Sequence, residues 1–172
     1  SAGSTGALLA GGMFKIGRIP GIERPALAPV MPGVKGGWLL IDSGANVDCQ
    51  SKHLLQFGMM GSVYMEKLGV KNPKVALLSN GTEDEKGNAL NHEVFPVLKE
   101  MKEINFVGNM EAREILSGNY DVVVTDGFWG NVALKSIEGT VITVMGKFFT
   151  GKENKLPKAA PAAAPAAAAP VA

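Results

Sequence analysis

Four short, largely apolar runs, each followed by a polar turn that contains glycine, constrain most strongly what this chain can fold into. Segments with apolar side chains at roughly helical spacing separate these runs. The runs are 38–41, 75–78, 104–107 and 121–125. Apolar strands that alternate with helices are typical of a mostly parallel sheet covered on both faces. We therefore expect an α/β fold with helices on both faces of the sheet.

The segments between the runs predict the helices. Ser51 can cap the first of them, and Gly69 can end it in a left-handed conformation. Gly139 and Gly146 argue against one unbroken helix at the end of the pattern. The expected helices are Ser51 to about Leu68, 88–101, 110–116 and one from about Asn131.

The two ends of the chain follow other patterns. Residues 4–16 fit a helix with a face of small side chains, and residues 26–31 fit a strand interrupted by a proline. The final segment is almost wholly alanine and proline, so it lacks the apolar surface that folding needs. We expect one folded domain over 1–150 and an Ala/Pro-rich disordered tail or linker over 151–172.

Composition excludes several classes of protein. The 172 residues carry a formal net charge of +1, which gives no global basic field for nucleic acid. The apolar runs are too short to cross a bilayer, and no secretory signal is evident. The single cysteine, Cys49, rules out an internal disulfide and fits a reducing compartment. We expect a cytoplasmic protein without a nucleic-acid partner.

Charge is nevertheless uneven near the start of the chain. The first 37 residues contain four basic residues and a single acidic one, Glu23. They are Lys15, Arg18, Arg24 and Lys35. An ordinary solvated loop explains this pattern, and so does a landing surface for an acidic partner.

The expected carboxyl ends of the strands are the main candidate for a binding site. In an open parallel α/β sheet, ligands bind beyond these ends. Glycine allows a close approach of the backbone, and small polar groups donate hydrogen bonds to oxyanions. Turns need such residues in any case, but four similar turns favour a polar ligand. The turns are 42–46, 79–82, 108–109 and 126–127.

Other candidates carry weaker signals. Residues 1–6 could present N–H groups of a helix start to an anion, or could simply cap that helix. Lys135 could reach back to a bound phosphate, or could be a solvated helix lysine. The acidic stretch 83–86 is more readily a solvated loop than a lid. His53 and His92 lack metal-ligand spacing, so no metal site is expected.

Cys49 follows Asp48 near a helix start, where a thiolate would be favoured. No histidine or glutamate at local spacing is available to activate it. A covalent cysteine mechanism is therefore the minority interpretation.

Seven motifs follow one another in a specific order. They are SAGSTGAL (1–8), RPAL (24–27), DSGANVDC (42–49), GSVY (61–64), KGN (86–88), NFVGN (105–109) and DGFWGNVALKSIEG (126–139). Over residues 1–145 the chain resembles the phosphate acyltransferases of the PlsX type. The resemblance implies a three-layer α/β/α fold related to phosphotransacetylases and the isocitrate dehydrogenase class. It also implies a homodimer, with acyl carrier protein and inorganic phosphate as partners and with no cofactor.

The implied reaction transfers a fatty acyl group from acyl-acyl-carrier-protein to inorganic phosphate, giving acyl phosphate for phospholipid synthesis. The resemblance places the strand ends at the cleft, with Asp42 and Asp126 orienting donors, and Lys86 and Asn88 closing the site from the acidic loop. Gly127 belongs to the substrate-binding set. The expected phosphate and oxyanion contacts are Ser4, Thr5, Asn46, Asn131 and Lys135, of which Asn46, Asn131, Lys135 and Asp42 form the catalytic set.

Two alternatives stay open: a non-catalytic module that binds acyl carrier protein, and a phosphate acetyl- or butyryltransferase that uses coenzyme A. Family chains begin with a further strand and continue beyond Gly139, so we expect a truncated chain of weak or no activity. The last predicted helix carries apolar side chains at helical spacing along one face. This apolar face would contact a second subunit or a membrane surface, or it would pack on the sheet as part of the core. Its residues are Ile137, Val141, Val144, Met145 and Phe148.

Overall fold

The computed structural model describes residues 4–150, with the exception of the Thr150 side chain. The predicted Ala/Pro tail, 151–172, lies outside the described residues. The chain forms two compact units, Ser1–Leu134 and Lys135–Ala172. Helix α4 (Gly127–Thr150) contributes residues to both. The domain boundary expected near residue 150 stays a prediction.

The first unit contains a five-stranded sheet in the order β1-β2-β5-β3-β4. Strands β2, β5, β3 and β4 are parallel, and β1 pairs with β2 in the antiparallel direction. Pro32 is tolerated in β1 because an edge strand has one side free of ladder hydrogen bonds. The bounds are β1 Val30–Gly33, β2 Gly36–Ile41, β3 Lys74–Ser79, β4 Asn105–Glu111 and β5 Val122–Val124. The mostly parallel sheet predicted from the apolar runs is confirmed.

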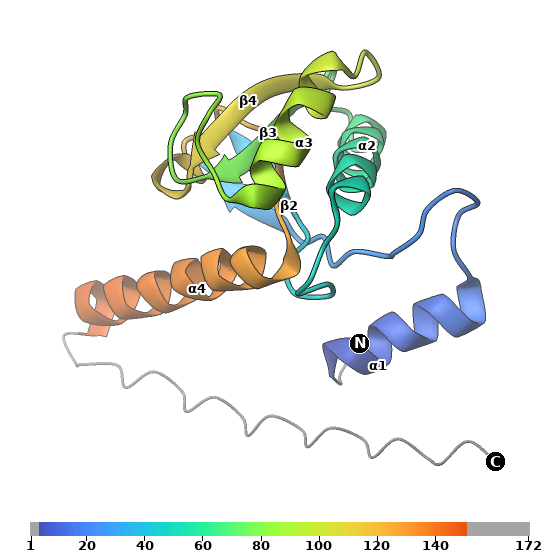
Figure 1. Cartoon of the computed structure of the whole chain (residues 1–172). Helices are drawn as coiled ribbons and strands as arrows, with labels where there is room; N and C mark the ends of the chain where they lie inside the picture. Colours follow the sequence, from blue (N-terminus) through green and yellow to red (C-terminus); the bar gives the residue numbers. More distant parts are fainter. Residues whose placement is uncertain (1–3, 151–172) are drawn as a thin grey trace. The chain divides into compact units, whose positions relative to one another are not determined.

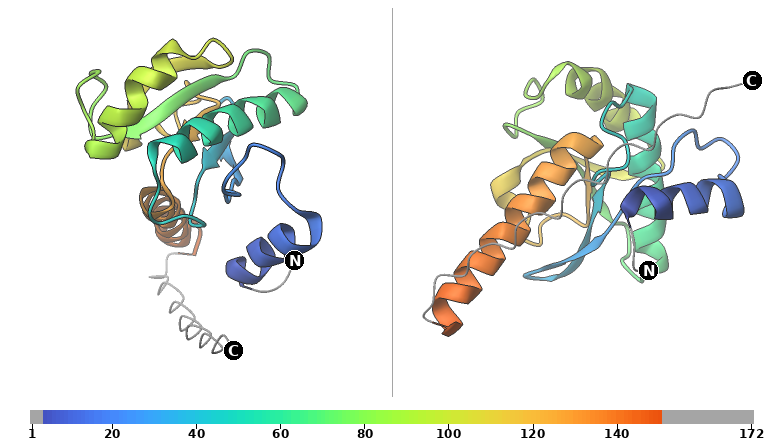
Figure 2. Two further views of the ribbon diagram at one scale, coloured as in Figure 1. Left: turned by 45° about the vertical axis from the view of Figure 1, so that its right-hand side comes forward. Right: turned by 90° about the horizontal axis from the view of Figure 1, so that it is seen from below.

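Helices α2 (Ser51–Lys67) and α3 (Ala89–Glu100) pack side by side on one face of this sheet (Figures 1 and 2). The predicted end of α2 at Gly69 is confirmed by the positive φ of +96° at this glycine. The predicted cap is wrong, because Gln50 rather than Ser51 precedes the helix and exchanges hydrogen bonds with His53. Asn88 caps α3 with its side chain.

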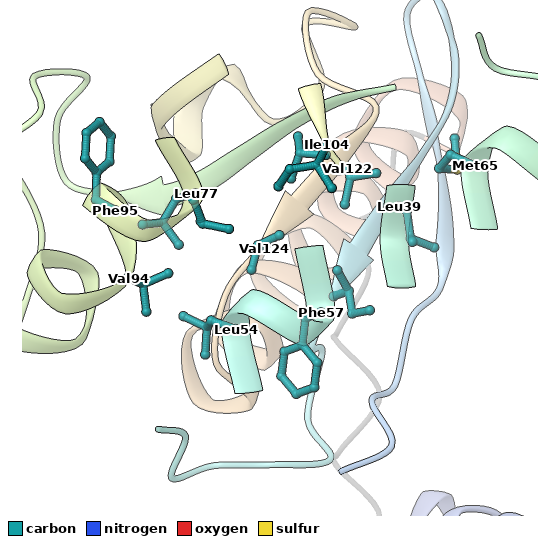
Figure 3. Close-up of a cluster of buried hydrophobic side chains, with 13 residues drawn as sticks. Leu39, Leu54, Phe57, Met65, Leu77, Val94, Phe95, Ile104, Val122 and Val124 are labelled. Atoms are coloured by element: carbon teal, nitrogen blue, oxygen red, sulfur yellow. The ribbon is translucent and has the colours of Figure 1, made fainter. Parts of the chain in front are cut away.

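The core lies between these two helices and the sheet (Figure 3). Alternate strand residues such as Leu39, Val75 and Val122 are fully buried, and Leu54 and Phe57 of α2 meet them. Gly58 and Gly61 of α2 face the same strands, and a side chain at Gly61 would come within 2.5 Å of Val122. The small residues let α2 lie close to the sheet.

Strand β4 continues past the turn that the sequence indicates. Gly108 has a φ of +103° and lies where the pairing with β3 shifts, since Val75 pairs with Phe106 but Leu77 pairs with Asn109. The extra residue is a β-bulge, which glycine accommodates without ending the strand. The helix predicted over 110–116 is therefore wrong, and only a 3₁₀ turn, Ala112–Glu114, follows.

The first residues form α1 (Thr5–Gly11) and a π-helical turn (Gly12–Ile16), as the pattern over 4–16 predicts. The strand expected over 26–31 forms only from Val30. Helix α4 begins at Gly127, four residues before the predicted start, and continues through Gly139 and Gly146. None of the helices in the described part of the chain is long and apolar enough to span a membrane.

Candidate functional site

The Asp42 loop, residues 42–49, follows β2 and is organised around one buried carboxylate. Asp42 Oδ1 accepts hydrogen bonds from the backbone N–H groups of Leu27, Gly44 and Ala45 at 2.9, 3.2 and 3.0 Å. Its Oδ2 accepts from the backbone N–H and the side-chain amide of Asn46 at 2.6 and 2.8 Å. Five donors thus share one carboxylate that has no exposed surface. Asp42 orients donors, and its oxygens are occupied by them.

The segment 24–27 is bound to this loop along its length. Ser43 donates to the Leu27 carbonyl from both its backbone N–H (2.9 Å) and its hydroxyl (3.1 Å). The Asn46 amide donates to the Pro25 carbonyl at 2.8 Å, and Arg24 donates to the Asp48 carbonyl at 3.1 Å. The RPAL and DSGANVDC motifs therefore form one hydrogen-bonded structure.

The start of α4 packs backbone to backbone against the Asp42 loop. The Gly127 N–H donates to the Asn46 carbonyl at 2.8 Å. A Cβ atom at Gly130 would overlap the Asp42 carbonyl oxygen, and one at Gly127 would come within 2.7 Å of Asn46. Only glycine permits this approach. The strand ends of β2 and β5, neighbours in the sheet, are thereby joined.

Asp126 begins α4 with a buried carboxylate. Its Oδ1 accepts from the Trp129 N–H at 2.9 Å, the bond expected of a residue that caps a helix. Burial raises the pKa of this carboxyl, hydrogen bonds from Trp129 and Phe128 lower it, and the nearby Asp42 and Asp48 raise it further. Like Asp42, Asp126 orients backbone donors.

The two asparagines of the predicted catalytic set differ in what they can still donate. Both amide hydrogens of Asn46 are used, by Pro25 and Asp42. Asn131 donates to the Ser43 carbonyl at 3.3 Å, and the second hydrogen of its amide has no partner among residues 4–150. Asn131 is therefore the better candidate for a direct contact with an anion, and Asn46 for positioning.

The Lys86 loop, residues 80–88, follows β3. The methylene groups of Lys86 lie across Gly81, where a Cβ atom would come within 2.6 Å of Lys86 Cγ. Within the described residues, the Lys86 ammonium has no hydrogen bond or ion pair. Asn88 uses its side-chain oxygen to cap α3 through the Asn91 N–H at 3.0 Å. The loop presents one unpaired cation near the end of a strand.

The remaining predicted residues lie elsewhere. Ser4 caps α1 through the Ala7 N–H at 3.3 Å, and no described hydrogen bond joins Ser4 or Thr5 to the Asp42 loop. Lys135 belongs to the second unit and forms an ion pair with Glu138 at 2.7 Å. The roles of Ser4, Thr5 and Lys135 in binding stay predictions.

Two titratable side chains, one at the end of the Asp42 loop and one in the first turn of α2, are not activated for chemistry. Burial raises the pKa of the Cys49 thiol to about 11, and its sulfur donates to the Asn46 carbonyl at 3.4 Å. His53 is buried, and its Nδ1 accepts from the Gln50 N–H at 3.0 Å. Burial also lowers the pKa of His53, with Arg24 acting in the same direction. Cys49 and His53 therefore support the structure around the Asp42 loop and are not candidates for catalysis.

An apolar cavity of about 380 Å³ lies on the side of the segment 24–27 and is lined mostly by apolar side chains. Its walls come from α1, the π-helical turn, residues 17–27 and Met60. Leu27 lines it and also donates its N–H to Asp42. The cavity lacks the converging polar groups that an oxyanion requires.

Sequence reasoning missed three contributors: Ser43, the carbonyl groups of 25–27, and Asn109. Ser43 uses its backbone N–H and carbonyl in addition to its hydroxyl, and backbone contacts leave no mark on residue type. The same holds for the carbonyl groups of Pro25 and Leu27. Asn109 was assigned to a turn, whereas it lies buried within β4 and donates to the Lys86 loop. A glycine that makes a bulge, rather than a strand end, was the signal available at Gly108.

Comparison with known proteins identifies the family. The model of the family described as "Fatty acid synthesis protein" matches residues 1–156. A protein named "Phosphate acyltransferase" from Bacillus cereus (strain B4264) is 60% identical over 146 residues, which cover 84% of this chain and 44% of that protein. Its counterpart in Bacillus licheniformis is 59% identical with the same coverage. The chain spans less than half the length of these curated relatives.

Solved structures support the fold. A branched-chain phosphotransacylase from Enterococcus faecalis V583 aligns with a TM-score of 0.56 at 18% identity, over 80% of this chain and 56% of that one. A phosphotransacetylase from Streptococcus pyogenes gives a TM-score of 0.50 at 18% identity, over 74% and 43%. These neighbours confirm the three-layer α/β/α class. The family model and the curated relatives confirm the resemblance: this chain belongs to the fatty acid synthesis protein family, together with proteins named phosphate acyltransferase.

Proposed function

We propose that this chain carries the phosphate-binding strand ends of a phosphate acyltransferase, which moves a fatty acyl group from acyl-acyl-carrier-protein to inorganic phosphate. The observation that carries the proposal is the joining of the Asp42 loop to the start of α4 in a chain 60% identical to phosphate acyltransferases. This joining brings the amide of Asn131 to the carboxyl edge of the sheet, where α/β proteins bind ligands.

The reaction needs no nucleophile from the protein. A phosphate oxygen attacks the thioester carbonyl carbon, the C–O bond of the acyl phosphate forms, and the C–S bond breaks. The phosphate proton leaves with the thiol of the carrier. A thiol with a pKa of about 11 is ionised in roughly one molecule in ten thousand at pH 7, which disfavours Cys49 as a competing nucleophile.

The protein's task is then to hold phosphate and carbonyl together and to stabilise the developing negative charge. We assign the unpaired amide hydrogen of Asn131 and the ammonium of Lys86 to this task, with Lys135 as a further cation. Asp42, Asp126 and Asn46 orient the loop. No cofactor takes part in the proposed reaction.

Acyl carrier protein, a second copy of the chain and a membrane surface are the proposed partners. Arg18, Arg24 and Lys35 are exposed at the start of the chain, and a basic surface of this kind is suited to an acidic partner. Val141, Val144, Met145 and Phe148 of α4 also have exposed side chains. Exposed apolar side chains at helical spacing are suited to a subunit or membrane contact. The proposed location is the cytoplasm, with peripheral membrane association.

Phosphate-dependent release of carrier thiol tests the reaction. The chain is incubated with acyl-acyl-carrier-protein or with acyl-coenzyme A, with and without phosphate, and acyl phosphate is trapped as the hydroxamate. The proposal expects phosphate-dependent product from the carrier substrate. Product from acyl-coenzyme A alone would favour the phosphotransacylase alternative. Phosphate binding without any turnover would favour the non-catalytic module.

A further inference from the structure

We propose that Asn109 is a positioning residue, whose buried amide holds the Lys86 loop and thereby places the Lys86 ammonium at the carboxyl end of β3. The inference rests on the proposed function and adds a residue to it. Asn109 lies in β4, directly after the bulge at Gly108, and only 4% of it is exposed.

The contacts of this amide cross from one strand to the loop of its neighbour. Asn109 Nδ2 donates to the Glu83 carbonyl at 2.8 Å and makes a longer contact of 3.4 Å with the Lys86 carbonyl. The Glu83 carbonyl also accepts from the Lys86 N–H at 3.1 Å. One side chain of β4 therefore fixes both ends of the turn that contains Lys86.

The bulge sets where this amide lies. Without the extra residue, Leu77 would pair with Gly108, and Asn109 would be displaced by one position to the other face of the sheet. Asn109 Oδ1 is buried and makes no hydrogen bond within the described residues. Burying an amide oxygen without a hydrogen bond costs free energy. The NH₂ group of the same amide must offset this cost, and its hydrogen bonds are to the Lys86 loop.

The loop does not need this contact to connect β3 with α3. Asn80 Oδ1 already accepts from the Gly87 N–H at 2.9 Å, and Asp84 pairs with Lys99 at 2.5 Å. What Asn109 adds is a fixed backbone at Lys86, whose stem lies across Gly81 and whose ammonium is unpaired among residues 4–150. A positioned, unpaired cation beside the strand ends is suited to an anion such as phosphate.

The test combines hydrogen exchange with phosphate titration of the 172-residue chain. Asn109→Leu should raise amide exchange at Lys86 and Gly87 at least tenfold and weaken inorganic phosphate binding at least tenfold. Asn105→Leu is the matched control, because Asn105 also joins β4 to a loop, through the Asn72 carbonyl at 3.1 Å, but at the other end of the strand. It should change neither quantity at these positions.

A double-mutant cycle separates positioning from a general structural role. In a Lys86→Met chain, Asn109→Leu should weaken phosphate binding little further, because the cation that it places is gone. If leucine prevents folding, Asn109→Ala removes the same donor. Gly81→Ala keeps the Asn109 amide, but its Cβ atom displaces the side chains of Lys86 and Glu83. It should therefore weaken phosphate binding, while the contact of Asn109 with the Glu83 carbonyl keeps loop exchange slow.

Unchanged exchange at Lys86 and Gly87 in folded Asn109 variants would overturn the inference. Loosened exchange with full phosphate affinity, while Lys86→Met binds weakly, would overturn it too, and so would equal effects of Asn109→Leu in both backgrounds. Absence of phosphate binding by the unmodified chain would instead contradict the proposed function, and the exchange measurement would still decide whether Asn109 holds the loop.

Discussion

The Asp42 loop follows β2 and the Lys86 loop follows β3, two strands of one sheet that β5 separates, and the two loops are built in opposite ways. Asp42 is fully buried, and its carboxylate accepts five hydrogen bonds. Lys86 is exposed, and no partner of its ammonium lies among the residues described. The first loop is therefore a saturated framework that fixes geometry, and the second offers a group that can still bind. Substitutions in the first should cost stability, and those in the second should cost binding.

The largest expected effect is on folding, from removal of the Asp42 carboxylate. Asp42→Ala leaves five N–H groups without their acceptor, and each buried donor left unpaired costs about 1–3 kcal/mol. Partial relaxation makes a total of about 3–5 kcal/mol in the free energy of unfolding the expected loss. Urea denaturation measures it. Asp42→Asn, which keeps one oxygen, should lose less, and a loss below about 1 kcal/mol in Asp42→Ala would refute the saturated framework.

A smaller loss of stability is expected from a single methyl group between the Asp42 loop and α4. Gly130→Ala places a Cβ atom against the Asp42 carbonyl oxygen, and overpacking of this kind costs about 1–3 kcal/mol. Gly139→Ala is the control in the same helix, because nothing lies within 4 Å of its Cβ position. The control should gain up to about 1 kcal/mol from helix propensity. Equal thermal stability of the two variants would show that the contact is not rigid.

The sequence predicts most strands of the sheet, but it does not predict the contacts that the two substitutions above would break. The runs 38–41, 75–78 and 121–125 predict the parallel strands, because continuous apolar residues fit buried strands. The reach of β4 beyond Gly108 was missed, since a Gly–Asn pair fits a turn as well as a bulge. Four of the five donors to Asp42 are backbone N–H groups, one of them 15 positions away, and no side-chain pattern encodes these four.

The site residues, like the strands, could be predicted from the sequence only in part. Asp42 and Asp126 were predicted to orient donors, and their hydrogen bonds have this geometry. Asn46 was predicted to contact phosphate, but both its amide hydrogens are used within the protein. Sequence indicates which polar groups gather at the strand ends. It does not indicate which of them are already satisfied, because this depends on carbonyl groups brought there by folding.

Lys135, which is paired with Glu138 and so differs from the unpaired Lys86, tests whether a cation that already has a partner also contributes to phosphate binding. Lys135→Ala should weaken phosphate binding about tenfold, or about 1.4 kcal/mol, while stability changes little, because the exposed pair with Glu138 contributes at most about 1 kcal/mol. Lys147→Ala, later in the same helix, is the control and should bind normally. Unchanged phosphate affinity in folded Lys135→Ala would remove Lys135 from the site.

The smallest expected effect on function comes from Cys49, which belongs to the framework. Cys49→Ser should keep most of the phosphate affinity and of any acyl transfer. Burial raises the pKa of the thiol from 9.0 to about 11, so the folded chain keeps a proton that the unfolded chain loses in this window. The thiol's contribution to stability should therefore decline between pH 9 and 11, and Cys49→Ser should lack this component. A trapped acyl-cysteine in mass spectrometry would contradict the assignment.

The central claim is that an oxyanion binds at the carboxyl edge of the sheet, between a saturated framework and unpaired donors. Titration of the ¹⁵N-labelled chain with inorganic phosphate, against chloride at equal ionic strength, tests it most directly. The account predicts that the largest shifts fall on the side-chain amide of Asn131 and on the backbone amides of residues 80–88. Shifts confined to other parts of the chain, such as the end of α3, or no saturable shifts at all, would contradict it.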